Sequence, residues 1–170
     1  MTNPKTRSAP TDLSTRLRAF LSENTTFTIA TVSDMGAPHA CDLFYAHGDD
    51  LTLYFLSDPK TRHVQNLMLG PRVSATIHGQ SRGWEDIRGI QLEGTAVRVE
   101  DAAERARGFA LYIAKYGFVK QWLTSASVLG SLLKGLGVVE LYKITPDWMR
   151  LIDNSLGFGH KEEWSRPASP

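Results

Sequence analysis

The sequence predicts a mainly β domain of the barrel or sandwich type, with a few flanking helices. Short segments rich in Thr, Val, Ile and Phe recur along the chain, separated by turns that contain Gly, Pro or Asp. Helical periodicity is confined to a few stretches, unlike the regular strand–helix alternation of a doubly wound sheet. The 170 residues are 42% hydrophobic and 22% charged, which suits one domain with its own core.

The strands are expected where apolar and polar residues alternate between turn residues. Gly89 and Gly94 lie inside the longest of these segments and predict a bulge or a close approach of two backbones. A turn at residues 145–147 is expected to separate the last two strands. The expected strands span residues 25–33, 39–46, 51–56, 72–78, 87–99, 138–144 and 148–152.

The helices are expected where apolar residues recur at helical spacing. Leu13, Leu17 and Leu21 form one stripe, and Thr11 or Asp12 precedes it as a possible N-cap. A second, short helix is expected to end at Gly70, because a proline follows directly. The expected helices span residues 13–23, 60–69, 100–116 and 118–134.

The remaining segments and the charge balance limit the class of protein. Residues 1–10 and 165–170 are expected to be tails, and residues 11–164 a single domain. The formal net charge of +1 provides no broad basic surface for nucleic acid or an acidic membrane. Neither a signal-like apolar segment nor a run of roughly 18 apolar residues is found. Cys41 is the only cysteine, so we expect no internal disulfide and a cytoplasmic protein.

Basic side chains gather where the second helix is expected to begin. Lys60, Arg62 and His63 would lie in its first turn, where the helix dipole disfavours cations by about 0.3–1 kcal/mol each. Cations at this end suit an anion, which the free amides and the hydroxyls of Ser57 and Thr61 would also bind. The sequence therefore predicts a phosphate site in this turn, and a solvated basic turn is the alternative interpretation.

Other chemical patterns in the sequence are weaker. His39 and Cys41 share one face of an expected strand, but no second pair of ligands follows at zinc spacing, so we expect no metal site. His160, Lys161 and Trp164 suit either a lid over the site or a surface tail. Neither a Gly-rich dinucleotide fingerprint nor a Walker loop is present.

Several of these segments, taken together in order, resemble a known family. Residues 53–63 read LYFLSDPKTRH and are followed by Asn66-Leu67 and by residues 70–73, GPRV. Residues 88–96 read RGIQLEGTA. This order resembles the FMN-binding split barrels of the pyridoxamine 5'-phosphate oxidase-like superfamily over about residues 25–100. The segment 148–164 looks like a less characterised branch of it.

The resemblance implies a six- to seven-stranded antiparallel split β-barrel with flanking helices, and it implies FMN as the cofactor. Ser57, Lys60, Thr61, Arg62 and His63 would hold the phosphate of FMN. Other residues would surround the isoalloxazine, and the cofactor would lie at a homodimer interface. These residues are Asp42, Leu43 and Phe44 along one strand, Phe55 and Leu56 nearby, and Trp84 and Gln91 from the second subunit.

The function implied is an FMN-dependent oxidoreductase that transfers a hydride to or from a small substrate. The chain has no arginine-rich substrate motif before Leu43, so we expect a substrate other than vitamin B6 phosphates. Because the superfamily also has members that bind haem or deazaflavin F420, two alternatives stay open. One is an F420-dependent reductase, and the other is a flavin or haem carrier or sensor without turnover. A structural dimer whose turn binds only buffer phosphate is a further alternative.

Overall fold

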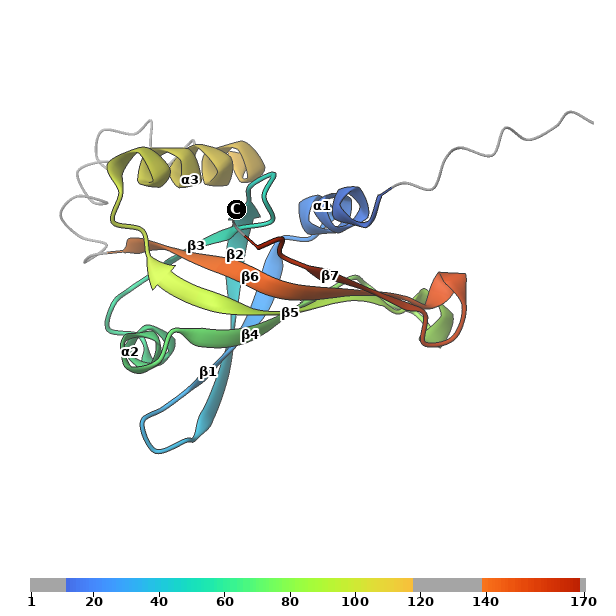
Figure 1. Ribbon diagram of the computed structural model, residues 1–170, viewed down its shortest axis with the longest axis horizontal. Coiled ribbons are helices and arrows are strands. Elements are labelled where there is room, and N and C mark those ends of the chain that lie inside the picture. Colours follow the sequence, from blue (N-terminus) through green and yellow to red (C-terminus); the bar gives the residue numbers. More distant parts are fainter. Residues whose placement is uncertain (1–11, 118–138, 169–170) are drawn as a thin grey trace, which may run out of the picture.

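The computed structural model describes residues 12–117 and 139–168, which form a barrel with helices on its surface (Figure 1). The predicted helix over 118–134 and the predicted tail over 1–10 lie outside the described residues. The elements in chain order are α1 (Leu13–Glu23), β1 (Thr26–Val32), β2 (Pro38–His47), β3 (Leu53–Ser57), α2 (Arg62–Leu69), β4 (Arg72–His78), η1 (Trp84–Asp86), β5 (Arg88–Arg98), α3 (Ala102–Lys115), β6 (Glu140–Asp153), η2 (Asn154–Leu156) and β7 (Lys161–Ser165).

The strands form one antiparallel sheet in the order β3-β2-β1-β4-β5-β6-β7. Because β3 also pairs with β6, strands β1 to β6 close into a barrel, and β7 is an extra strand on β6. This arrangement confirms the predicted antiparallel split barrel. Among the described residues, no helix is long and apolar enough to cross a membrane.

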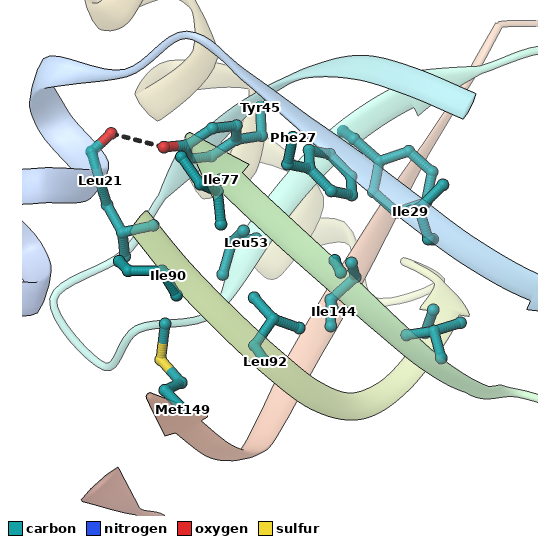
Figure 2. Close-up of a cluster of buried hydrophobic side chains, with 14 of the residues drawn as sticks. Leu21, Phe27, Ile29, Tyr45, Leu53, Ile77, Ile90, Leu92, Ile144 and Met149 are labelled. Carbon is teal, nitrogen blue, oxygen red and sulfur yellow. Dashed lines mark hydrogen bonds between the residues drawn. The ribbon is translucent and has the colours of Figure 1, made fainter. Parts of the chain in front are cut away.

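The barrel is filled by the inward-facing residues of its strands (Figure 2). Among them are the rings of Phe27, Tyr45 and Phe55. The centroid of the Phe27 ring lies 5.6 Å from that of Tyr45 and 5.7 Å from that of Phe55, and both contacts are edge-to-face. The Tyr45 hydroxyl donates a hydrogen bond of 2.8 Å to the Leu21 carbonyl, which ties α1 to the barrel (Figure 2). The apolar stripe of α1 is therefore part of the core.

The predicted strands over 138–144 and 148–152 are in fact one strand, β6. The predicted turn at residues 145–147 is wrong, because Pro146 lies opposite Gly94 in a β-bulge. Trp148 pairs with Glu93 and Pro146 with Gly94, so the intervening Asp147 has no direct partner. A bulge tolerates a residue without an N–H, and strand pairing therefore continues past the proline.

The C-terminal segment also differs from its prediction. No strand is expected after residue 152, but β7 pairs with the second half of β6. Its sequence, KEEWS, is charged and exposed on alternate positions, so it carries no clear strand pattern. Ser165, the first residue of the expected tail, is still paired with Trp148.

The helices lie on two sides of the barrel (Figure 1). α3 contacts β2, β3 and β6, whereas α2 contacts β1 and β2. Asp101 caps α3 by accepting a hydrogen bond from the Glu104 amide. α2 begins at Arg62 rather than at the expected Lys60, because the chain is still in a turn at Asp58–Thr61.

Candidate anion site at the turn between β3 and α2

The turn that joins β3 to α2 is held by hydrogen bonds of Asp58. The Lys60 amide donates to Asp58 Oδ1 at 2.8 Å, and the Thr61 amide donates to the Asp58 carbonyl at 3.0 Å. Pro59, which cannot pair in a ladder, ends the strand pattern after Ser57. The turn therefore has a fixed shape at the point where α2 begins.

The outer side of this turn carries unpaired positive charge. Lys60 and Arg62 are exposed, and neither forms an ion pair with a described residue. Thr61 is the N-cap of α2, but its side chain makes no capping hydrogen bond. First-turn amides of a helix have no intrahelical partner, so these amides and the two cations are available to one anion. The predicted cation at the helix start is found in Arg62, while Lys60 precedes the helix.

The inner side of the turn is a chain of hydrogen bonds. His63, 6% exposed, places Nε2 at 2.6 Å from Ser57 Oγ and 3.1 Å from Thr61 Oγ1. Ser57 Oγ lies 3.1 Å from Thr61 Oγ1, which donates to the Asp58 carbonyl at 2.8 Å. Both sides of the turn are thus polar, but the inner side is already satisfied by protein groups.

The contacts of this hydrogen-bond chain favour one tautomer of His63. A carbonyl oxygen only accepts hydrogen bonds, so the Thr61 hydroxyl donates its one proton to the Asp58 carbonyl. All of these contacts are hydrogen bonds together in one arrangement, in which the Ser57 hydroxyl donates to Thr61 and His63 Nε2–H donates to Ser57. Burial, and secondly the charge of His39, lower the pKa of His63, which favours the neutral ring. The lone pair of His63 therefore lies on Nδ1, on the side away from the turn.

That lone pair points to β2. Cys41 Sγ lies 3.3 Å from His63 Nδ1, and His39 precedes Cys41 on the same face of the strand. Ligand atoms of these three side chains all lie within 4.8 Å of one another. Burial, and secondly Asp42, raise the pKa of Cys41, which favours the thiol form. His63 is thus part of an inner cluster and is not an outward-facing cation as expected.

Asp42 and Phe44 lie on the outer face of β2, whereas Leu43 points inward against the core. Asp42 accepts a hydrogen bond from Thr28 Oγ1 and borders a shallow hollow of about 110 Å³ with Thr76 and His78. Within β2, only Tyr45, Ala46 and His47 pair with β3. Residues 38–44 of β2 pair with β1 on one side, and on the other side they have no partner strand among the described strands. Backbone groups at this edge are available to a ligand.

The remaining predicted site residues are spread over the molecule. Phe55 is fully buried and stacks on Tyr142, with the ring centroids 5.4 Å apart. Leu56 packs on the side of the barrel that α3 covers. Gln91 accepts a hydrogen bond from Arg150 at 3.3 Å, and Trp84 packs against Phe158 at 5.5 Å. The described residues of one chain do not bring Gln91 or Trp84 into contact with the turn.

The possible lid at the C-terminal end has a structural role instead. Trp164 lies in β7 and packs against the main core. His160 Nε2 lies 3.1 Å from a Glu162 carboxylate oxygen, and Lys161 is exposed in β7. These three residues are therefore held within or beside the extra strand.

The closed barrel, its extra strand and the basic turn before a short helix together define a split-barrel protein. The chain belongs to the pyridoxamine 5'-phosphate oxidase family, whose family model matches residues 13–153. A UPF0306 protein of Enterobacter sp. is 33% identical over 129 residues, which are 72% of this chain and 75% of that protein.

Solved structures share the fold. A haem-binding protein from Mycobacterium smegmatis has a TM-score of 0.71 at 18% identity, covering 92% of this chain but only 59% of its own. A putative pyridoxamine 5'-phosphate oxidase from Listeria innocua has a TM-score of 0.64 at 21% identity, covering 82% and 98%. At sequence identities this low, the likeness shows a shared fold. It does not identify the ligand of this chain.

Proposed function

We propose that the protein binds FMN and acts as an oxidoreductase on a small substrate. The observation that carries the proposal is the outer side of the β3–α2 turn. There, Lys60 and Arg62 lie beside the uncapped start of α2, and neither forms an ion pair with any residue that the structure describes. Membership of the pyridoxamine 5'-phosphate oxidase family supports a flavin as the molecule whose phosphate would bind at this turn.

Each part of the turn has a distinct role in this proposal. The Arg62 guanidinium would bind two phosphate oxygens, and the Lys60 ammonium would add a second positive charge. Thr61 and the first amides of α2 would complete the contacts. Ser57 and His63 would form the floor of the turn and set its shape, because their polar atoms already bond each other.

The isoalloxazine would lie along β2. The open edge at residues 38–44 offers backbone donors and acceptors, and Asp42 and Phe44 border it on the outer face. FMN supplies hydride transfer, while the protein supplies orientation and access. We further propose a homodimer in which Trp84 and Gln91 of a second copy approach this face, since the contacts that the structure describes for them within one chain are with Phe158 and Arg150 rather than with the turn.

The proposal is tested first by the absorbance spectrum of the purified protein and mass spectrometry of the released ligand. Flavin bands and the mass of FMN support it, whereas a colourless protein that does not bind added FMN refutes it. Rapid reduction by NADH or NADPH, followed by reoxidation with a small acceptor, would establish turnover. Inertness toward both nicotinamides would instead favour a carrier.

The phosphate contact is tested by Arg62→Ala. Loss of a charge-assisted contact of about 1.5–3 kcal/mol should weaken FMN binding roughly 10- to 100-fold. The matched control is Arg82→Ala, which removes an exposed arginine from the loop before η1. If both variants bind FMN equally well in a fluorescence titration, the turn does not hold the phosphate.

Haem is the second candidate, supported by the fold shared with the Mycobacterium smegmatis protein. A Soret band in the same spectrum would identify haem. Binding of reduced F420 in preference to FMN would identify the third cofactor that the family resemblance allows.

A further inference from the structure

Three side chains that can ligate a metal converge beneath the β3–α2 turn. His39 and Cys41 come from β2, and His63 comes from the first turn of α2. Their ligand atoms lie within 4.8 Å of one another. The separation of 3.3 Å between Cys41 Sγ and His63 Nδ1 is close to the ~3.5 Å expected for two ligands of one tetrahedral zinc ion.

His63 is oriented as a metal ligand. In metal sites, one ring nitrogen of a histidine usually donates to a fixed acceptor, so that the other presents its lone pair to the ion. In the arrangement that makes every contact of the turn a hydrogen bond, Nε2–H donates to Ser57 Oγ, Ser57 donates to Thr61, and Nδ1 faces Cys41. The hydrogen-bond chain that holds the turn thus also holds His63 in the tautomer that a metal requires.

We propose that His39, Cys41 and His63 bind a zinc-class divalent cation. Two imidazoles and one thiolate suit zinc, whereas magnesium and calcium prefer oxygen ligands, which this cluster lacks. Three protein ligands leave a fourth position open. The ion would join β2 to α2 directly under the turn, so it would fix the position of Arg62. Cofactor identity does not enter this inference, because the three ligands face away from the outer side of the turn.

The alternative is a Cys–His hydrogen bond without a metal, and cobalt distinguishes the two. Titration of the full chain with Co²⁺ should saturate at one ion per chain. It should also give the intense visible bands of a tetrahedral site and a thiolate-to-cobalt charge-transfer band. Cys41→Ser should abolish the charge-transfer band, and His63→Ala should weaken Zn²⁺ binding at least tenfold in competition with a chromophoric chelator. His78→Ala, on an exposed histidine of β4, is the matched control and should leave both unchanged.

Two further measurements keep the proposal testable if a ligand variant does not fold. Zn²⁺ should protect Cys41 of the unaltered protein from iodoacetamide. Ser57→Ala should weaken Zn²⁺ binding roughly 10- to 100-fold, as is typical when an outer-shell partner of a metal-bound histidine is lost. Co²⁺ binding without a charge-transfer band, or unchanged alkylation with Zn²⁺ present, would overturn the proposal. FMN content is measured separately by mass spectrometry, so failure of the metal site and failure of the flavin proposal are distinguishable.

Discussion

Replacing Gly94 by alanine is expected to destabilise the barrel where β5 pairs with the bulge of β6. A Cβ at this position would lie 2.4 Å from the Thr145 carbonyl oxygen and 2.9 Å from Pro146 Cα. Ordinary contact begins at 3.4 Å, so the backbones must separate by 3.4 − 2.4 = 1.0 Å. Both obstructing atoms belong to the backbone, and no side-chain rotation relieves the clash.

The cost follows from this forced separation. Overpacking costs about 1–3 kcal/mol. Ladder hydrogen bonds stretched at the bulge add to that cost, each being worth about 1 kcal/mol. We therefore expect the free energy of unfolding to fall by about 2–3 kcal/mol, or roughly 4–12 °C in Tm for a chain of this size.

The assay is urea unfolding followed by circular dichroism, with Gly83→Ala as the matched control. A methyl group added at Gly83 would meet no atom within 4 Å, and the φ of −157° at this residue is open to alanine. The control should be neutral or slightly stabilising, because alanine restricts the unfolded chain. If Gly94→Ala is as stable as Gly83→Ala, the close approach at the bulge is not real.

Two further predictions concern buried polar groups. Asn66→Ala should lower the free energy of unfolding by about 1–3 kcal/mol, because Oγ1 of the buried Thr31, a residue only 1% exposed, loses the hydrogen bond of 2.9 Å that the Asn66 amide donates. Adding Thr31→Val should recover part of this loss. Equal stability of Asn66→Ala and the exposed Met68→Ala would contradict the prediction. Burial lowers the pKa of Lys115 to about 8. Between about pH 8 and 10 the unfolded chain therefore binds a proton that the folded protein lacks. Because of this difference, the free energy of unfolding should rise with pH in that window. Lys115→Met should remove this rise, whereas Lys161→Met, at an exposed lysine, should keep it. The measurement is the midpoint of urea unfolding at each pH. Parallel pH profiles for the two variants would refute the assignment of the rise to Lys115.

The sequence predicted elements well where a local pattern determines them. The stripe of α1 and the alternation of β4 gave both elements with the observed bounds, residues 13–23 and 72–78. Gly94 was correctly singled out, because a glycine inside a strand indicates a close approach. In each case the information lies within a few adjacent residues.

Prediction failed where pairing between distant segments overrides local preference. Pro146 is a turn signal by itself, but the glycine opposite it in β5 accommodates a bulge, and β6 continues. β7 has almost no apolar alternation and forms because the second half of β6 offers it an edge. Neither partner is visible from the segment's own residues.

The candidate site also has one part that could be predicted from adjacent residues and one part that could not. Lys60, Arg62 and His63 lie close together in the sequence, and their position at the expected start of a helix identified the turn. The cluster beneath it needs His39 and Cys41 from β2 together with His63 from α2. The sequence has no second ligand pair at short spacing, and so no metal was expected at the place where the fold supplies the third ligand.

The short length of β3 connects the fold to both proposals. β3 pairs with β2 only at residues 45–47 and with β6 over its whole length, so it closes the barrel while leaving residues 38–44 of β2 uncovered along one edge. α2 follows β3 directly and contacts β1 and β2, which places its first turn near this uncovered stretch. Leu56 and Ser57 pair with β6 but not with β2, so β3 separates from β2 after Phe55 and leaves this edge open. The open edge, the exposed cations and the inner cluster therefore all lie where β3 separates from β2 and the chain turns into α2.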